Sequence, residues 1–412
     1  MVELQYFIAY EMVAVFLTLL IAFTETTVAV DELIFIQIIW RHGDRAPIFA
    51  YPTDIHQEEA WPYGWGELTE LGMRQQFALG RLLRQRYIEE NHNFLSHNYK
   101  PKELYIRSTD VNRTLISAMA NLAGMYPAGT PGKDYPSSKH WPSHWTPIPI
   151  HTVENEEDFV GNVFCRCPRV DQLIALIRCS KYYRELADEN KEFFDYVSEK
   201  SGMRVNLDNV ETINDIHYVE KSHNMSQPSW LTDDVSKKLR NLSVITSKFI
   251  YGISVPRISE LTKLRGGSLL KLLLENINRK KHCLLNPEDS SCLWILQRKY
   301  FALSAHDTTV AALLATLADE KILEQGLPQY TASVAIELWN KTDILFHEAF
   351  HHQYRAITRF TKGCPSDSDF CPLDAFLKRS EIFLPNNIKN ECLPRKINKS
   401  IYKLCNISVV EF

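Results

Sequence analysis

Three apolar segments of this chain end directly in groups of polar residues. The longest, 33–40, is almost continuously apolar and rich in β-branched side chains, which is typical of a strand buried on both faces. Shorter segments at 104–106 and 300–304 repeat the arrangement. Polar groups just beyond the carboxyl ends of buried strands lie where open α/β sheets bind ligands. The three segments therefore predict a parallel sheet with a site at one edge.

Helical patterns fill the stretches between these strands. Apolar residues recur at helical spacing among Arg and Gln over 68–87, and 114–125 and 308–317 predict two further helices. The segment 154–265 is richer in charge and has few strand-like runs, so it predicts an all-helical insertion. Pro, Ser, Trp and His crowd 127–149, which predicts an irregular loop.

The expected fold class is therefore α/β, with a mostly parallel sheet flanked by helices and an inserted all-helical cap domain. The α/β domain is expected to comprise 30–153 and 266–412, and the cap 154–265. With 412 residues, the chain is long enough for one large domain with such an insertion.

An apolar run at 12–23 precedes the first strand. The run is too short to span a bilayer, which needs about 20 apolar residues, but it suits the apolar region of a signal peptide. The residues before it include Glu3 and Glu11 and no Lys or Arg, a difference that translation from Met12 would remove. The alternative is a buried N-terminal helix. We assign 1–29 to a signal peptide and expect secretion, extracellular or lumenal, with no membrane anchor in the mature chain.

Charge and cysteine content narrow the classes of function. The net charge of -4 gives no broad basic surface for nucleic acid, so any cations that bind a phosphate must be gathered locally. Nine cysteines fit an oxidising compartment, and their spacing does not resemble that of zinc ligands. Disulfides within the pairs Cys283 and Cys292, and Cys364 and Cys371, would each close a short loop. The odd total leaves at least one thiol unpaired.

Six Asn-x-Ser/Thr sequences are acceptors for N-glycosylation, as found on exported proteins. One of them, at Asn112, lies beside the expected site in a segment expected to pack inside, so we expect it to remain unused. The candidates for carrying a glycan are Asn224, Asn241, Asn340, Asn398 and Asn406.

The polar groups at the strand ends contain the parts of a phosphoryl-transfer site. Such a reaction requires a nucleophile, cations around the phosphoryl oxygens and an acid for the leaving oxygen. Arg41, Arg45 and Arg107 are candidates for the cations, because a guanidinium binds phosphate oxygens bidentately and keeps its charge. His42 lies between two of these arginines, and a neutral imidazole is a competent nucleophile towards phosphorus.

The third strand supplies two more candidates. His306 is expected to bind the phosphoryl group from the other side, and Asp307 to protonate the leaving alkoxide and then activate water. Three arginines disfavour a further positive charge, so the pKa of His42 should be lowered and the ring neutral in mild acid. Activity should be highest at acidic pH and fall as the pH rises through the pKa of Asp307 in the complex.

These motifs resemble those of the histidine acid phosphatases, the branch of the histidine phosphatase superfamily typified by prostatic and lysosomal acid phosphatases. The resemblance runs from about Leu33 to Cys392, and it is carried by 41–47, 64–72, 105–110, 145–153 and 300–309. It implies a phosphoglycerate mutase-like α/β domain with a helical cap, and neither a metal nor another cofactor. Many members dimerise, which leaves a homodimer open.

The resemblance also assigns roles to individual residues. It makes His42 the nucleophile that carries a phosphohistidine intermediate, and Asp307 the proton donor. The residues that it assigns to phosphate binding are Arg41, Arg45, Arg107 and His306.

Cysteine usage departs from the pattern of the family, which usually keeps three disulfides. The resemblance implies the pairs Cys167–Cys392 and Cys364–Cys371. Val219 and Val334 stand at the positions of the third pair. The additional cysteines, among which Cys283–Cys292 is the expected new bridge, are Cys165, Cys179, Cys283, Cys292 and Cys405.

Three alternative functions stay open. The first is a non-catalytic secreted binding protein or antigen that retains the phosphatase fold, although binding alone would not require His42 and Asp307 together. The second is a phosphomutase, and the third a phytase or another sugar-phosphate specialist, since the cap and loops determine substrate choice. The expected partners are small phosphomonoester substrates, with phosphoproteins left open, and no nucleic acid.

Overall fold

The structure of the chain, a computed structural model, describes residues 32–396 except 91–93, 318–321, 340–341 and 348–352. The predicted signal peptide at 1–29 therefore lies outside the described residues. In the described part of the chain, no helix combines the length and apolar character needed to cross a membrane.

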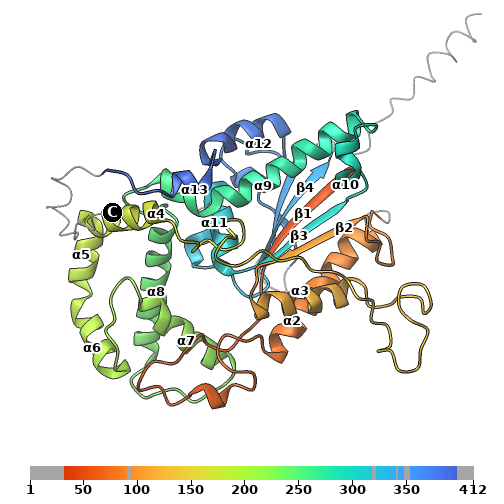
Figure 1. Ribbon diagram of the computed structural model, residues 1–412. Helices are drawn as coiled ribbons and strands as arrows, with labels where there is room; N and C mark the ends of the chain where they lie inside the picture. The colour runs from red at the N-terminus through yellow and green to blue at the C-terminus, as the bar shows by residue number, and fades with distance from the viewer. Residues whose placement is uncertain (1–31, 91–93, 318–321, 340–341, 348–352, 397–412) are drawn as a thin grey trace, which may run out of the picture. The chain divides into compact units, whose positions relative to one another are not determined.

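A mixed sheet forms the centre of the fold (Figure 1). Its strand order is β2-β3-β1-β4-β5-β6, with β7 paired to β5. The strands are β1 Leu33–Arg41, β2 Leu104–Ser108, β3 Tyr300–Ala305, β4 Ser333–Trp339, β5 Thr342–His347, β6 Arg355–Ala356 and β7 Phe370–Cys371.

The sheet is parallel on one side of β1 and antiparallel on the other. Strands β2, β3 and β1 run parallel, as the three apolar segments predict. Strand β4 runs antiparallel to β1, and β5 runs antiparallel to β4. The antiparallel side was not expected from the sequence. The short connection between Trp339 and Thr342 requires that β5 run antiparallel to β4, because parallel strands need a much longer crossover.

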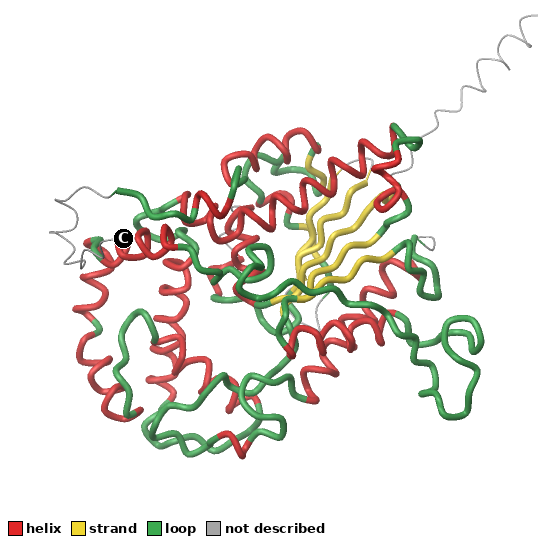
Figure 2. The backbone as a smooth tube through the Cα atoms, viewed as in Figure 1, coloured by secondary structure: helices red, strands yellow, loops and turns green. Residues whose placement is uncertain are grey.

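Helices cover both faces of the sheet (Figures 1 and 2). The predicted helix at 68–87 is α2, which is capped by the Thr69 side chain and continues as a π-helical turn. On this face lie α2 Glu70–Arg84, the π-turn Gln85–Glu90 and α3 Asn112–Met125. On the other face lie α9 Ser259–Leu285, α10 Leu293–Leu296, α11 Asp307–Leu317 and α12 Leu373–Ser380, followed along the chain by α13 Ile388–Glu391. The 3-10 turns are Glu58–Ala60, Ser290–Cys292, Ile322–Gln325, Thr358–Phe360 and Glu381–Phe383.

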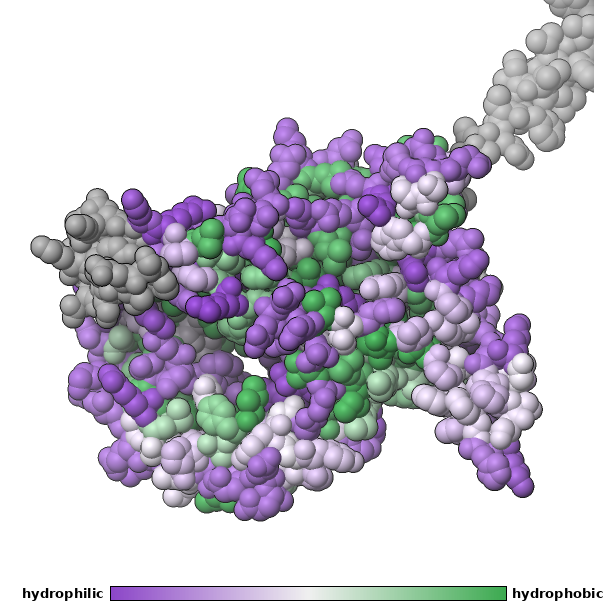
Figure 3. Space-filling model, in the orientation of Figure 1, coloured by the Kyte–Doolittle hydropathy of each residue, from purple (hydrophilic) through white to green (hydrophobic). Residues whose placement is uncertain are grey.

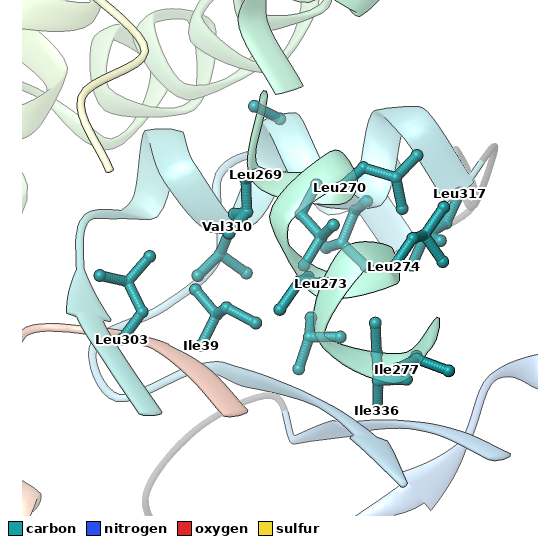
Figure 4. Packing of buried hydrophobic residues seen from close by; sticks show 14 of the residues in the cluster. Ile39, Leu269, Leu270, Leu273, Leu274, Ile277, Leu303, Val310, Leu317 and Ile336 are labelled. Carbon is teal, nitrogen blue, oxygen red and sulfur yellow. The ribbon is translucent and has the colours of Figure 1, made fainter. Parts of the chain in front are cut away.

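Side chains of β1 alternate between two hydrophobic cores. Phe35 and Ile39 pack with α9 and α11, whereas Ile36, Ile38 and Trp40 pack with α2 and α3. Figure 4 shows the leucines of α9 directed at the strands. Because β1 is covered on both faces, its sequence is continuously apolar rather than alternating.

Gln37 interrupts the apolar sequence of β1 and is nevertheless fully buried. Its amide donates a hydrogen bond to the carbonyl of Leu273 at 2.8 Å and accepts one from Asn276 at 2.9 Å, both on α9. A buried amide that is satisfied in this way costs little free energy and fixes how α9 lies on the sheet.

Five helices between β2 and β3, which we call the cap helices, enclose a core of their own (Figure 1). Leu261 and Leu264 of α9 belong to this core, whereas Leu269 and the residues after it belong to the core of the sheet. The predicted domain boundary at residue 265 thus falls inside one continuous helix, and the division at 154–265 stays a prediction. The cap helices are α4 Pro168–Arg178, α5 Lys181–Glu189, α6 Lys191–Ser201, α7 Val210–Ser222 and α8 Asp233–Ile250.

Disulfides join three pairs of described cysteines: Cys167–Cys392, Cys283–Cys292 and Cys364–Cys371. All three pairs were expected. Cys179 is also disulfide-bonded, and Cys405 lies outside the described residues. Cys165 is a buried free thiol, and burial raises its pKa to about 11, which makes it an inert thiol rather than a reactive one.

Candidate active site

The three predicted polar groups meet at the carboxyl ends of the parallel strands. The register pairs Arg41 at the end of β1 with Ala305 at the end of β3, and Ser108 at the end of β2 with Ser304. Helices α3 and α11 begin immediately beyond these ends and direct their N-termini at the same region. Figure 3 shows a hollow in the surface between the cap helices and this edge of the sheet.

His42 is buried at the centre of this group, with 2% of its surface exposed. Its Nδ1 lies 2.7 Å from the carbonyl oxygen of Gly43, so Nδ1 carries the proton and Nε2 keeps a free lone pair. Burial lowers the pKa of His42 well below its ordinary value, and Arg113, Arg41, His306 and Arg45 lower it further. The ring is therefore neutral in acid, as predicted, and its free nitrogen is available to attack phosphorus.

Gly43 allows the loop after β1 to lie directly on the first turn of α2. A Cβ atom at Gly43 would come within 2.2 Å of the carbonyl oxygen of Gly72, and one at Gly72 within 2.1 Å of the carbonyl oxygen of Asp44. No side chain fits at either position without moving the backbone. This close approach fixes the orientation of His42 relative to α2.

Arg41 lies beside His42 and is held from three directions. Its Nη2 atom is 2.9 Å from a carboxylate oxygen of Asp307, and its Nη1 donates to the carbonyl of Pro328 at 2.7 Å. The guanidinium lies over the ring of Tyr330, 4.2 Å from the centroid. Its Nε has no partner, which leaves one donor for a ligand.

Arg45 is held by the cap helix α7. Its Nη2 lies 3.0 and 2.9 Å from the two carboxylate oxygens of Asp215. Burial opposes the charge, but Asp215 outweighs it and raises the pKa of Arg45 above its ordinary value. Asp215 was not identified from the sequence, because nothing in the helical pattern of 154–265 indicates which face of α7 meets the strand ends.

Arg107 and Arg113 differ in their relation to the two histidines, and the sequence did not indicate this difference. Arg107 donates to the fully buried carboxylate of Asp158, and it is not among the charges that most perturb His42 or His306. Arg113, in the first turn of α3, is the charge that acts most strongly on both histidines. Burial, with Arg45 and Arg41 nearby, lowers the pKa of Arg113 to about 10.

Sequence reasoning therefore missed Arg113. One signal was available, since α3 begins directly after a strand-end group and its first turn must lie next to the site. Asn112, which precedes Arg113, is exposed rather than packed inside, and its amide donates to Glu67 at 3.0 Å. Of the predicted glycan acceptors, Asn224 and Asn241 are exposed, and Asn340, Asn398 and Asn406 lie outside the described residues.

His306 faces His42 across the site, with ring centroids 5.6 Å apart. Arg113 can only donate, so the 3.4 Å contact makes Nδ1 of His306 an acceptor. Nε2 then carries the proton and donates to the hydroxyl of Thr109 at 3.0 Å. Burial and then Arg113 lower the pKa of His306 to about 3, so this ring is also neutral.

Asp307 begins α11 and accepts a hydrogen bond from the amide of Thr308 at 2.7 Å. Burial raises its pKa, but Arg41, Arg45 and His306 together outweigh burial, and the pKa of Asp307 is lowered overall. Asp307 is thus a carboxylate in the empty site. An anion bound between Asp307 and the arginines would reverse this balance and favour the protonated form.

A metal site is not evident among these residues, since the arginines and neutral histidines of the site suit an anion rather than a cation. Away from the site, ligand atoms of His282, Asp289 and Cys292 lie within 4.8 Å of one another. Cys292 is bonded to Cys283, so its sulfur is not available as a thiolate ligand.

Comparison with known proteins agrees with this geometry. The family model of the histidine phosphatase superfamily (branch 2) matches residues 32–352. Human prostatic acid phosphatase is 34% identical over 381 residues, covering 92% of each chain. Lysosomal acid phosphatase of Xenopus laevis is 34% identical over 364 residues, covering 88% of this chain and 79% of its own.

Solved structures show the same fold at much lower identity. Phytase of Hafnia alvei, in complex with myo-inositol hexakis sulphate, superimposes with a TM-score of 0.61 at 16% identity, covering 89% of this chain and 100% of its own. Phytase of Citrobacter braakii gives a TM-score of 0.61 at 15% identity, covering 88% of this chain and 99% of its own. On the strength of the family model and of the two acid phosphatases, the chain belongs to branch 2 of the histidine phosphatase superfamily.

Proposed function

We propose that this protein is an acid phosphatase that hydrolyses phosphate monoesters through a phosphohistidine intermediate on His42. The observation that carries the proposal is the free Nε2 of a neutral, buried imidazole among the guanidiniums of Arg41, Arg45 and Arg113. A neutral ring is a nucleophile, and the cations stabilise the charge that builds on the phosphoryl oxygens.

The reaction proceeds in two steps. In the first, Nε2 of His42 attacks phosphorus, the ester P–O bond breaks, and the leaving oxygen takes a proton from Asp307. In the second, the Asp307 carboxylate accepts a proton from water while the water oxygen attacks phosphorus. The P–N bond then breaks, and inorganic phosphate leaves with His42 neutral again.

The phosphate ligands that we propose differ in one residue from the set predicted from the sequence. Arg41, Arg45 and His306 keep that role. Arg113 takes the place of Arg107, because Arg113 acts most strongly on both histidines, whereas Nη2 of Arg107 is paired with the buried Asp158, although its Nε has no partner. Arg107 supports the site indirectly, since it holds the segment around Asp158, which precedes α4.

The disulfide bonds of the chain favour export. Disulfides among the described cysteines fit an oxidising compartment, and we propose that 1–29 is a signal peptide and that the mature protein acts in an acidic lumen or outside the cell. The cap of 154–265 is part of the proposal, as the element that shapes the substrate side of the hollow. Homodimerisation stays a prediction.

The test compares secreted wild-type protein with His42→Ala on an aryl phosphate at pH 5. His140→Ala, which alters an exposed histidine in the loop 127–149, is the control. Wild type and control should hydrolyse the ester, and His42→Ala should be at least about a thousandfold slower. Rapid quenching into alkali, where a P–N bond survives, should trap labelled phosphate on wild type alone. Full activity of His42→Ala would refute the proposal and leave the non-catalytic binding protein as the alternative.

A further inference from the structure

Helix α7 presents two carboxyl groups to the site, at Glu211 and Asp215, one turn apart on the same face. The carboxylate of Asp215 is paired through both oxygens with Arg45. Glu211 has no lysine or arginine paired with it in the described part of the chain. One of the two carboxyl groups thus positions a cation of the site, and the other is free to meet a ligand.

Glu211 lies close enough to the reacting groups to interact with them. Burial raises the pKa of Glu211 to about 7, and the charges of Asp215 and Asp307 add to this effect. Arg41 and the Ser243 hydroxyl act in the opposite sense. Because Asp215, one turn further along α7, contacts Arg45, Glu211 lies beside the phosphate site, and its interaction with Asp307 agrees with a position next to the leaving alcohol.

A buried hydroxyl interacts electrostatically with Asp307 and Glu211. Tyr251, at the end of α8, is 1% exposed, and its Oη has no hydrogen-bond partner. Burial raises its pKa, Asp307 and Glu211 raise it further, and Arg265 on α9 opposes them. Leaving a buried donor unpaired costs free energy, so this hydroxyl is a candidate partner for a polar group of a ligand.

We propose that Glu211 and Tyr251 form a leaving-group subsite beside Asp307 that selects phosphate esters of amino alcohols. The arginines neutralise the phosphoryl group itself. Beyond it, the Glu211 carboxyl on α7, once it is ionised, attracts an ammonium group on the alcohol and repels a carboxylate or a second phosphate. This inference rests on the proposed function, and it distinguishes the chain from enzymes that accept polyanionic esters.

The test uses two esters of matched size, O-phosphoethanolamine and phosphoglycolate, whose two-carbon alcohols end in an ammonium and a carboxylate. The ratio of their kcat/KM values cancels effects that are common to both substrates. Wild type, Glu211→Gln and the control Glu192→Gln, which alters an exposed side chain of α6, are each assayed at pH 5 and pH 7.5.

At pH 7.5 the ratio should favour phosphoethanolamine in wild type and in Glu192→Gln, and it should be smaller at pH 5, where Glu211 is largely protonated. In Glu211→Gln the ratio at pH 7.5 should fall about tenfold, an interaction of about 1.4 kcal/mol. An unchanged ratio in Glu211→Gln, or a wild-type ratio that does not rise with pH, would overturn the inference while the proposed function stands. Failure of wild type to hydrolyse any ester, including an aryl phosphate, would overturn both.

Discussion

Asp44 and His223 form an ion pair in which Nε2 of the histidine lies 2.7 Å from Oδ2 of the aspartate. Asp44 belongs to the loop after β1, and His223 follows the end of α7. The same carboxylate oxygen accepts a hydrogen bond from the hydroxyl of Thr69 at 2.5 Å. Together with the pair between Arg45 and Asp215, this contact ties the middle and the C-terminal end of α7 to the loop of His42. A change in either contact therefore moves the cap and the phosphate site together.

The first prediction concerns the stability of this ion pair. The hydrogen bond to Asp44 raises the pKa of His223, although burial opposes it. Because the folded pKa is the higher one, the stabilisation is complete below the unfolded value of about 6.5 and is lost as the pH rises through the folded value. We expect His223→Gln to be less stable than wild type by about 1 kcal/mol at pH 5, with a smaller difference at pH 8.

Urea unfolding at the two pH values measures this difference, with His140→Gln as an exposed control. A difference that stays constant, or that grows with pH, would show that His223 stabilises the fold by packing rather than by its charge. Packing is a real alternative here, because the His223 ring meets Trp61 edge to face, with centroids 5.2 Å apart.

The second prediction separates Arg113 from Arg107. Arg113→Ala should lower kcat/KM for an aryl phosphate by about a hundredfold or more, because a cation next to the phosphoryl oxygens is lost. Arg107→Ala should instead lower the free energy of unfolding by about 3 kcal/mol, since it leaves the buried carboxylate of Asp158 without its cation. Initial rates and thermal unfolding, measured for both variants, show which arginine acts on the substrate and which stabilises the fold. The assignment is wrong if Arg107→Ala loses as much kcat/KM as Arg113→Ala at unchanged stability.

The third prediction concerns the proton from Asp307. In Asp307→Asn the leaving oxygen departs without an acid, so an alkyl phosphate should lose about a hundredfold or more in kcat and a nitrophenyl phosphate about tenfold or less. The sensitivity of kcat to the pKa of the leaving alcohol should therefore be steeper in the variant. Equal losses for the two esters would remove Asp307 from the role of acid. In Asp307→Asn, Arg41 also loses its carboxylate partner, which could change substrate binding. KM for both esters must therefore be measured together with kcat.

The sequence predicted best those strands and helices whose hydrophobic pattern lies within a short segment of the chain. The strands β1, β2 and β3 and the helices α2, α3 and α11 follow from periodicity, and His42 and Asp307 follow from their places at strand ends. Residues that reach the site from a distant part of the chain left no such signal. Asp215 and Glu211 lie on one face of a charged helix, and only the packing of α7 against the loop after β1 shows which face it is.

Arg107 is a residue that was identified from the sequence but whose partner could not be predicted from it. As the first charged residue of its strand-end group it has the chemistry of a phosphate ligand, but its Nη2 atom donates to Asp158, which lies 51 positions away in the sequence. The antiparallel side of the sheet is a comparable case. The apolar content of β4 fits either direction, whereas the direction of β5 relative to β4 follows from the short connection between them.

The last prediction concerns the buried carboxyl groups of Glu220 and Asp54, which, like His223 and Asp44, lie on α7 and on the loop after β1. Glu220 on α7 is fully buried and lies against Asp54 of the loop after β1, which is itself 7% exposed. Burial raises the pKa of Glu220, and the nearby charge of Asp54 adds to this. Glu220 also accepts a hydrogen bond from the amide of Gln227, at 3.0 Å. The folded protein therefore keeps a proton on this pair under conditions in which the unfolded chain releases it.

The sign of the effect follows from linkage. Because the folded pKa of Glu220 lies above its unfolded value of about 4.5, stability falls as the pH rises from the unfolded value to the folded one. Glu220→Gln removes this titration, so the variant should gain about 1–3 kcal/mol relative to wild type between pH 5 and pH 8. Urea unfolding of both proteins across this range, with Glu192→Gln as control, makes the comparison. A gap that does not change with pH would mean that Glu220 is ionised throughout. If the gap widens as expected, Glu220 and His223 both fasten α7 to the loop of His42 most firmly in acid, where the proposed reaction runs.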